Sequence, residues 1–352
     1  MKVGIVGFPR SGKSTIFAAL TGQDVATGSF GEPGTVHLGT IKVPDPRVDE
    51  LARRFRPRKV TYAEIVFVDF PAPPAHGEAK TRALDSATVS QMRDADALVQ
   101  VVRGFVDPLT GEPPSPRADL EAFQTELVLN DLVIVERRLE RLKKEKGKER
   151  ERALLERLHE ALEQERPLRR LNLSAEEATS LAGFGFLSRR PLMVVWNVDE
   201  TQARAPMPPE VAQWLAEQEV QGLVLAGKIE MEIARLPESD RAAFLADLGL
   251  ESSARDRFIR AAYELLDLIS FLTAGEDEVR AWTIRRGTTA VKAAGKIHSD
   301  IERGFIRAEV LAYDDFVAFG SEAKAREGGR LRLEGKDYVV RDGDIVHFRF
   351  AV

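Results

Sequence analysis

Short apolar and β-branched runs punctuate the chain as far as Ala226, and helical patterns lie between several of them. Consecutive runs separated by helical segments are typical of parallel strands, which need crossover connections and carry helices on both faces of the sheet. This pattern predicts an α/β fold with a mostly parallel sheet. The expected strands are Lys2–Gly7, Leu38–Val43, Ala63–Asp69, Ala97–Val102, Leu192–Trp196 and Leu223–Ala226.

The interval from Val102 to Leu192 is far longer than one βαβ crossover, which needs about thirty residues in all. Apolar residues recur there at alternating steps of four and three, and a charged break interrupts them at residues 143–148. We therefore expect an antiparallel helical hairpin inserted into the α/β domain. It can be an arm that contacts a partner or a solvated coiled coil that packs only on itself. The repeating residues are Val128, Leu132, Val135, Leu139, Leu142, Leu155, Leu158 and Leu162.

In the C-terminal region the sequence pattern changes to short strands around one helical stretch, which predicts a small α+β module. The expected elements are strands at Arg280–Ile284, Gly304–Val310, Gly329–Leu333, Tyr338–Val340 and Ile345–Phe350, and a helix at Ala290–Ile297. The chain is thus predicted to have three parts: an α/β domain (1–106 and 190–278), a helical insertion (107–189) and a C-terminal domain (279–352).

Composition narrows the class of protein. The 352 residues suffice for two or three domains, and the 43% hydrophobic share excludes a disordered chain. The sequence contains no cysteine, which fits a reducing cytoplasm and removes thiolate chemistry. We expect neither a signal peptide nor a membrane segment. The net charge of −5 gives no global basic footprint for nucleic acid, so sequence-specific DNA binding is not expected.

A complete phosphate-binding pattern, G-x-x-x-x-G-K-S, begins at Gly7, between the first apolar run and a helical run. Its glycines allow backbone N–H groups to face a phosphate chain, and the helix N-terminus favours negative charge. Lys13 is expected to reach the β- and γ-phosphates, and the Ser14 hydroxyl to ligate Mg²⁺. The residues expected to hold the phosphates are Pro9, Arg10, Ser11, Gly12, Lys13, Ser14 and Thr15.

Three later segments complete the predicted nucleotide site. Asp69 ends an apolar run, which places its carboxylate at the strand edge where a second Mg²⁺ contact is needed. Asn197 opens an N-x-x-E loop in the position where N-K-x-D loops read guanine. Val198 and Glu200 replace the Lys and Asp of such a reader, so the loop is a poor match for guanine. A last loop, Ala226-Gly227-Lys228, can cover the base with the aliphatic stem of its lysine.

The order of these motifs resembles that of the YchF family, the Obg-like ATPases. The resemblance covers the whole chain and is most specific in Val43-Pro44-Asp45-Pro46-Arg47 and in the block from Val279 onward, which contains Gly304-Phe305-Ile306-Arg307-Ala308-Glu309-Val310. It implies a P-loop NTPase domain and a C-terminal TGS domain, a β-grasp fold of ubiquitin-like shape. It also implies a preference for ATP, association with ribosomes and a cytoplasmic location.

The N-terminal domain departs from the family pattern. Arg10 and Ser11 stand where the P-loop usually has Asn and Val, and switch II reads Asp69-Phe70-Pro71-Ala72-Pro73 instead of D-x-A-G-L. Pro73 cannot orient an attacking water, so intrinsic hydrolysis is expected to be slow. Gln91 matches a position where the family often has histidine; it is either a water-orienting residue or a surface residue. Thr35 is the candidate for the switch I ligand of Mg²⁺.

The sequence therefore predicts a monomeric P-loop NTPase that binds ATP, or GTP, with Mg²⁺ and hydrolyses it slowly in association with the ribosome or its RNA. The alternative is a non-hydrolysing, nucleotide-dependent adaptor that binds RNA or ribosomes, in which the altered switch II leaves the site without turnover. The retained Lys13, Ser14 and Asp69 favour the hydrolase. A small-molecule kinase is a third reading, for which the sequence offers no lid or second substrate pocket.

Overall fold

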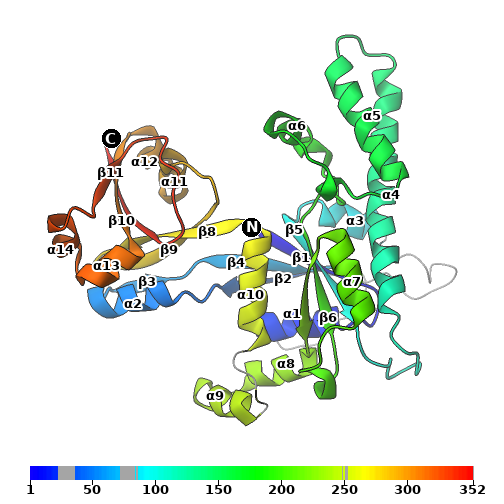
Figure 1. The fold of residues 1–352 in the computed structure, drawn as a ribbon, viewed down its shortest axis with the longest axis horizontal. Coiled ribbons are helices and arrows are strands. Elements are labelled where there is room, and N and C mark those ends of the chain that lie inside the picture. Colours follow the sequence, from blue (N-terminus) through cyan, green and yellow to red (C-terminus); the bar gives the residue numbers. More distant parts are fainter. Residues whose placement is uncertain (23–35, 72–83, 85, 248, 250–252, 352) are drawn as a thin grey trace. The chain divides into compact units, whose positions relative to one another are not determined.

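The computed structural model describes residues 1–22, 36–71, 84, 86–247, 249 and 253–351. The chain divides into two compact units. The first unit comprises Met1–Thr40 and Val66–Phe258, and the second comprises Ile41–Ile65 and Ile259–Val352. Both units are therefore built from segments that are distant in sequence (Figure 1).

A six-stranded sheet with strand order β2-β4-β1-β5-β6-β7 organises the first unit. The strand pairs β1–β4, β1–β5, β5–β6 and β6–β7 are all parallel, as expected. The central strands are almost wholly apolar because they are covered on both faces. The strands are β1 (Lys2–Val6), β2 (His37–Lys42), β4 (Glu64–Asp69), β5 (Ala97–Arg103), β6 (Leu192–Asn197) and β7 (Gln221–Leu225).

Helices pack against this sheet, and one buried cluster between sheet and helices includes Leu98, Phe123, Val194 and Trp214. They are α1 (Lys13–Thr21), α3 (Ser86–Met92), α7 (Pro209–Gln218), α8 (Gly227–Arg235), α9 (Glu238–Asp247) and α10 (Ala254–Leu265), with a 3-10 turn, η4 (Glu200–Gln202). Among the described helices, none combines the length and the apolar character that crossing a bilayer requires.

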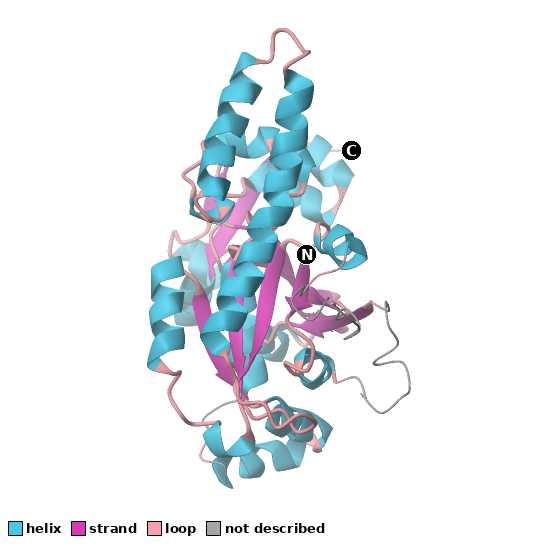
Figure 2. Cartoon of the chain, turned by 90° about the vertical axis from the view of Figure 1, so that its right-hand side faces the viewer, coloured by secondary structure: helices cyan, strands magenta, loops and turns pink. Residues whose placement is uncertain are grey.

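The predicted hairpin consists of α4 (Pro116–Leu142) and α5 (Glu149–Glu163), which run antiparallel side by side (Figures 1 and 2). Its apolar residues form a cluster of their own, in which Val128, Val135 and Leu142 of α4 meet Leu155, Leu158 and Leu162 of α5. The repeat seen in the sequence is therefore the buried seam of the hairpin. Short elements lead back to β6, namely η2 (Leu168–Arg170), α6 (Ala175–Ser180) and η3 (Ala182–Phe184).

The second unit contains a mixed sheet with strand order β11-β10-β12-β8-β9-β3. The hairpin β8–β9 is antiparallel, β12 lies parallel beside β8, and α11 packs on a core that includes Phe271, Ala293 and Phe348. Its strands are β3 (Lys59–Thr61), β8 (Leu268–Ala274), β9 (Glu278–Arg285), β10 (Phe305–Ala312), β11 (Arg332–Glu334) and β12 (Asp344–Phe350). Its helices are α2 (Pro46–Phe55), α11 (Ala290–Ile297), α12 (Ser299–Arg303), α13 (Tyr313–Phe319) and α14 (Glu322–Glu327).

Three sequence expectations differ from the structure. Residues 41–65 were expected in the α/β domain, but β3 pairs with β9 and this segment belongs to the second unit. Residues 259–278 also belong there, because they contain β8, which pairs with β9 and β12. Tyr338–Val340 forms no strand and contributes only an isolated bridge between Val339 and Thr289. The Tyr338 hydroxyl instead donates to Asp344 Oδ2 at 2.7 Å, so this segment is held by side-chain bonds.

One buried carboxylate fastens the helical insertion to the α/β core. Asp131 of α4 is 0% exposed and accepts hydrogen bonds from the backbone N–H groups of Leu187 and Ser188, at 2.8 and 2.7 Å. These residues precede β6, so the contact ties the hairpin to the start of a central strand. Burial raises the pKa of Asp131 to about 6, although the hydrogen bonds with Ser188 and Leu187 act in the opposite direction.

This shift predicts a pH dependence of stability. The pKa of Asp131 is higher in the folded than in the unfolded protein. Its contribution to the free energy of unfolding is therefore fully present below about pH 4 and is lost as the pH rises through about 6. Two pKa units correspond to about 3 kcal/mol. We expect Asp131→Asn to remove this dependence, so that the stability of the variant relative to wild type improves from pH 4 to pH 7. Urea unfolding at several pH values measures the difference.

The exposed Asp337 supplies the control for this measurement, as Asp337→Asn changes the same charge without a buried environment. A difference between Asp131→Asn and wild type that does not vary between pH 4 and pH 7 would contradict the assignment.

Candidate nucleotide-binding site

The P-loop turns sharply between β1 and α1, and two glycines make the turn possible. Gly7 has φ 154° and Gly12 has φ 85°, values that L side chains rarely adopt. A Cβ atom on Gly7 would lie 2.5 Å from the carbonyl oxygen of Val101, and one on Gly12 would lie 2.2 Å from Nδ2 of Asn197. The loop therefore packs closely against Val101 of β5 and Asn197 of β6, and these contacts fix the path of its backbone.

The first turn of α1 follows this loop directly. Gly12 occupies the N-cap in the left-handed conformation, no side chain caps the helix, and its first turn contains no acidic residue. The amide groups at this end consequently have no carboxylate of their own to satisfy them. A helix N-terminus in that condition is suited to binding an anion such as phosphate.

A buried lysine and a buried aspartate lie beside the loop, near enough to interact electrostatically. Lys13 is 8% exposed and Asp69, the last residue of β4, is 4% exposed. Burial lowers the pKa of Lys13, and the nearby Asp69 carboxylate partly offsets this. Burial likewise raises the pKa of Asp69, against the attraction of Lys13 and a hydrogen bond with Ser14. Each charge is thus poorly solvated, and additional opposite charge at this place would stabilise both.

The same residues fit a hard divalent cation. The Ser14 hydroxyl and the Asp69 carboxylate are in hydrogen-bond contact, while the buried Oδ1 of Asp69 has no hydrogen-bond partner in the described part of the chain. Mg²⁺ is typically held by one or two protein oxygens together with phosphate oxygens and water. No cluster of three or more His, Cys, Asp or Glu ligands occurs among the described residues, so a metal here would need oxygens from a bound ligand.

Asn197, at the end of β6, connects the P-loop to the last loop of the site. Its Nδ2 donates to the carbonyl oxygen of Ser11 at 2.9 Å, and its Oδ1 accepts from the N–H of Gly227 at 3.1 Å. The side chain is 4% exposed. Sequence reasoning placed Asn197 in the base-reading loop, and the structure shows that both ends of its amide also hold the backbone of the site.

The remaining residues of the predicted base loops lie around Asn197. Val198 is buried, and its N–H donates to the carbonyl oxygen of Leu225 at 3.0 Å. Glu200 begins η4 and is exposed. Ala226 caps α8, Gly227 is its first residue, and Lys228 is exposed. The structure therefore brings the 197–200 and 226–228 loops together at the carboxyl ends of β6 and β7.

The other predicted residues lie at the P-loop, away from it, or outside the described residues. Pro9 and Thr15 are half-buried in the P-loop and the first turn of α1. Gln91 is exposed near the end of α3, and its predicted role in orienting water stays a prediction. Thr35 lies outside the described residues, as do Ala72 and Pro73 of switch II.

The sequence reasoning missed one pair of charges at the P-loop. Arg10 Nε lies 2.8 Å from Oδ2 of Asp107, a buried residue in the loop that follows β5. A sequence indication existed, because β1 and β5 were expected in one parallel sheet and the loops after adjacent parallel strands lie at the same edge.

Comparisons with known proteins agree with this geometry. A family model described as a 50S ribosome-binding GTPase matches residues 2–138, and a model for the C-terminal part of YchF GTPases, described as a protein of unknown function, matches residues 268–351. The ribosome-binding ATPase YchF of Haemophilus ducreyi is 41% identical over 365 residues, covering 100% of this chain and 99% of that protein. The chain belongs to the YchF family.

Other members of the YchF family match equally completely. The ribosome-binding ATPase YchF of Bacillus subtilis is 38% identical over 369 residues, covering 100% of both chains. The solved structure of the Schizosaccharomyces pombe YchF GTPase matches with a TM-score of 0.87 at 29% identity, covering 99% of this chain and 97% of that chain. The resemblance inferred from sequence motifs is thereby confirmed.

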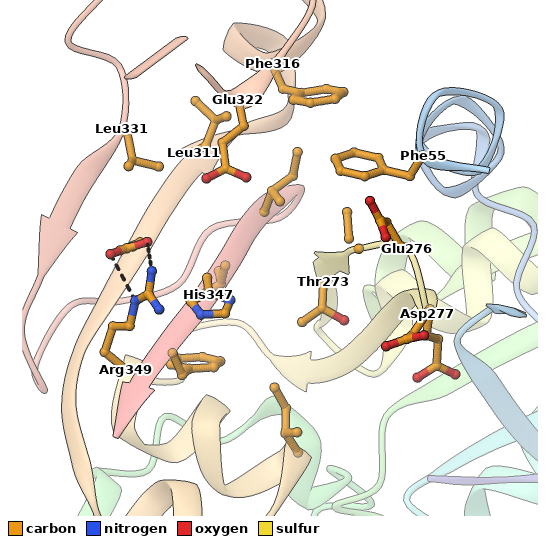
Figure 3. A pocket seen from close by; sticks show the side chains of 18 of the residues that line it. Phe55, Thr273, Glu276, Asp277, Leu311, Phe316, Glu322, Leu331, His347 and Arg349 are labelled. Atoms are coloured by element: carbon orange, nitrogen blue, oxygen red, sulfur yellow. Dashed lines mark hydrogen bonds and ion pairs between the residues drawn. The ribbon is translucent and has the colours of Figure 1, made fainter. Parts of the chain in front are cut away.

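The second unit of this YchF-family chain has a concave surface of its own. A half-open cavity of about 590 Å³ lies among α2, the end of β8, α13 and β12 (Figure 3). Phe55 and Phe316 stack at 5.7 Å between ring centres, and Arg349 on β12 donates to Glu309 at 3.1 and 3.2 Å. None of its lining residues belongs to the P-loop, and the charged groups that line it are mostly paired with each other or with neighbours. This cavity is therefore separate from the P-loop cluster.

Asn197 provides a direct test of the site architecture. Asn197→Ala leaves the Ser11 carbonyl and the Gly227 N–H without their partner in a buried place, which typically costs about 1–3 kcal/mol. We expect the variant to unfold at lower urea concentration and to bind nucleotide more weakly than wild type. Asn130→Ala is the matched control, because in the described part of the chain the Asn130 amide donates to the Glu126 carbonyl of its own helix. Equal loss of stability in the two variants would show that Asn197 does not hold the loops together.

Proposed function

We propose that this chain binds ATP, and GTP less well, with Mg²⁺ at the P-loop, hydrolyses the terminal phosphate slowly, and acts in association with the ribosome in the cytoplasm. The observation that carries this proposal is the cluster formed by the buried Lys13 and Asp69 with the half-buried Ser14. It combines, at the N-terminus of α1, an ammonium, a hydroxyl and a carboxylate oxygen that has no hydrogen-bond partner among the residues that the structure describes.

Each residue has a distinct role in this proposal. The N–H groups from Arg10 to Thr15 bind phosphate oxygens beside Pro9, and Lys13 neutralises charge on the β- and γ-phosphates. Ser14 and Asp69 hold Mg²⁺, with Thr35 as the candidate third contact. The metal supplies additional charge stabilisation on the transferred phosphoryl group. The poorly solvated charges of Lys13 and Asp69 favour such binding, because ligand charges replace the water that both have lost.

Base selection is assigned to the loops at residues 197–200 and 226–228. A guanine reader uses an aspartate that accepts from both N1–H and N2–H₂ of the base. Here the acid is Glu200, one methylene longer and at the first position of η4, so the two-bond geometry of guanine is not matched. Lys228 is exposed at the start of α8, where its stem can lie over the ring.

Slow turnover follows from what the chain offers for activating water. The residue after the expected switch II glycine position is Pro73, which has no side-chain donor or acceptor. Gln91 is the proposed substitute, and its exposed position on α3 leaves it accessible. Most of the rate enhancement is therefore assigned to electrostatic stabilisation by the P-loop and Mg²⁺. A non-hydrolysing adaptor is the outcome if this stabilisation proves insufficient.

The ribosomal association rests on relatives and on domain organisation. The proteins of Haemophilus ducreyi and Bacillus subtilis are both named ribosome-binding ATPases. We assign the C-terminal module, expected at residues 279–352 and extended by β8, to a TGS domain. A β-grasp-like strand order supports this, in which β12 lies between β10 and β8 and runs parallel to β8. The partner is the ribosome or its RNA, the protein acts as a monomer, and neither DNA sequence nor membrane is involved.

The first test removes the lysine. Lys13→Ala deletes the one ammonium buried among the described P-loop residues, so we expect ATP affinity to fall below detection and phosphate release to fall to background. Isothermal titration calorimetry and a phosphate-release assay measure the two quantities. Lys228→Ala is the control in the same domain, for which a smaller, base-dependent loss is expected. A folded Lys13→Ala protein with unchanged ATP affinity would refute the proposed site.

The second test addresses the base. Glu200→Asp, alone and with Val198→Lys, restores the residues of a guanine reader. Two correctly placed hydrogen bonds to a base are worth about 1–3 kcal/mol, so selectivity is expected to move toward GTP by about 5- to 150-fold. Because Val198 is buried, the single change at Glu200 is the cleaner variant. Dissociation constants for ATP and GTP decide the matter, and a wild-type protein that already binds GTP tenfold more tightly than ATP contradicts the assignment.

A further inference from the structure

Arg10 brings a second cation to the P-loop. Its side chain is 46% exposed, with Nε 2.8 Å from Oδ2 of Asp107 and Nη2 4.0 Å from Oε2 of Glu112. Unlike the ammonium of Lys13, this guanidinium lies at the surface of the site. It is therefore accessible to an incoming ligand while remaining paired with two carboxylates.

The carboxylates belong to one compact loop, residues 104–115, which we call the latch loop. Asp107 organises it: Oδ1 accepts from the N–H groups of Leu109 and Thr110 at 2.9 and 3.3 Å, and the Asp107 N–H donates to the carbonyl oxygen of Glu112 at 2.9 Å. Hydrogen bonds from Leu109 and Thr110, together with the nearby Arg10 and Arg103, lower the pKa of Asp107. The carboxylate is thus ionised and fixed in place.

The latch loop occupies a special position in the chain. It connects Arg103, the last residue of β5, to Pro116, the first residue of α4. Arg103 fastens its base by donating to the carbonyl oxygens of Phe105 and Glu112, at 3.1 and 2.8 Å. The ion pair of Arg10 consequently joins the phosphate-binding loop to the segment that begins the helical hairpin.

The backbone of Arg10 is also unusual. Its φ is 65°, in the left-handed region, which a residue with a Cβ seldom adopts and which costs free energy. Strain of this kind persists where surrounding contacts hold it and is concentrated at functional sites. In Arg10 it directs a long cationic side chain from the middle of a phosphate-binding loop.

We propose that Arg10 exchanges partners between the latch loop and the phosphates of the bound nucleotide. Without nucleotide, Asp107 and Glu112 hold the guanidinium. With a triphosphate in the P-loop, the guanidinium transfers to phosphate oxygens, for which its planar fork is suited, and the latch loop loses its attachment. Arg10 thereby stabilises negative charge during phosphoryl transfer and reports the nucleotide state to α4. This rests on the proposed binding of nucleotide at the P-loop.

Asp107→Asn is the informative variant, because asparagine keeps the Oδ1 acceptor for Leu109 and Thr110 while removing the charge that attracts Arg10. Arg10→Ala removes the cation itself. Arg58→Ala is the matched control, since Arg58 is a surface arginine paired with a surface aspartate, Asp277, at 3.4 Å. The double variant Arg10→Ala with Asp107→Asn completes a thermodynamic cycle.

Two measurements follow these variants. In hydrogen exchange of the nucleotide-free protein, Arg10→Ala and Asp107→Asn are expected to speed exchange in residues 104–115 at least threefold, and a non-hydrolysable ATP analogue is expected to do the same in wild type, with ADP having less effect. In turnover at saturating ATP, Arg10→Ala is expected to lower the rate at least tenfold. Asp107→Asn should increase affinity for the ATP analogue severalfold, and this gain should disappear in the double variant.

The proposal is overturned if exchange in residues 104–115 is the same in Arg10→Ala and wild type without nucleotide. It is equally overturned if Asp107→Asn increases affinity with and without Arg10, or if Arg10→Ala changes turnover no more than Arg58→Ala. Failure of the nucleotide site itself is distinguishable. In that case wild type binds no ATP in calorimetry, whereas the nucleotide-free exchange measurement still reports whether Arg10 holds the loop.

Discussion

The candidate site depends on one buried amide. Asn197 donates to the Ser11 carbonyl and accepts from the Gly227 N–H, so a single planar group fixes the spacing between the loop for phosphate and the loop for the base. Neither backbone group could be left unpaired in this buried place without a cost of about 1–3 kcal/mol. The lack of a side chain at Gly12 is part of the same arrangement, because a Cβ there would clash with the amide nitrogen of Asn197.

Next to the loops that Asn197 connects, the charges of Lys13 and Asp69 favour ligand binding over the stability of the ligand-free protein. Lys13 and Asp69 are buried close together, and burial disfavours the charged form of both. An apolar pair of similar volume would pack at lower cost. The retention of two ionisable groups where stability alone does not favour them is a common property of functional sites, and it agrees with the assignment of this edge of the sheet to phosphate and metal.

The sequence predicted the parallel sheet, the hairpin and the P-loop cluster because each carries a local pattern: buried apolar strands, heptad-like spacing and glycines at fixed offsets. It did not reveal β3, or that residues 41–65 belong to the second unit, because β3 pairs with β9, more than two hundred positions away. It did not reveal β8, because this strand follows a helix without a break in the apolar pattern. Asn197 was identified, but its bonds to Ser11 and Gly227 depend on tertiary geometry. The Arg10–Asp107 pair was missed for the same reason.

Helix α4 belongs to two hydrophobic cores at once. Leu120, Phe123 and Leu127 lie in the core of the sheet, whereas Val128, Val135 and Leu142 lie in the core of the hairpin. The helix continues without interruption from one to the other, and its segment from Val128 to Leu142 extends roughly 22 Å. Since no proline or break lies between the two parts, a rotation of the helix at the sheet also moves its far end in the hairpin. A tilt of about 10° at the sheet would move the far end of that segment by about 4 Å, so a modest rearrangement at the base becomes a displacement large enough to make or break contacts at the tip.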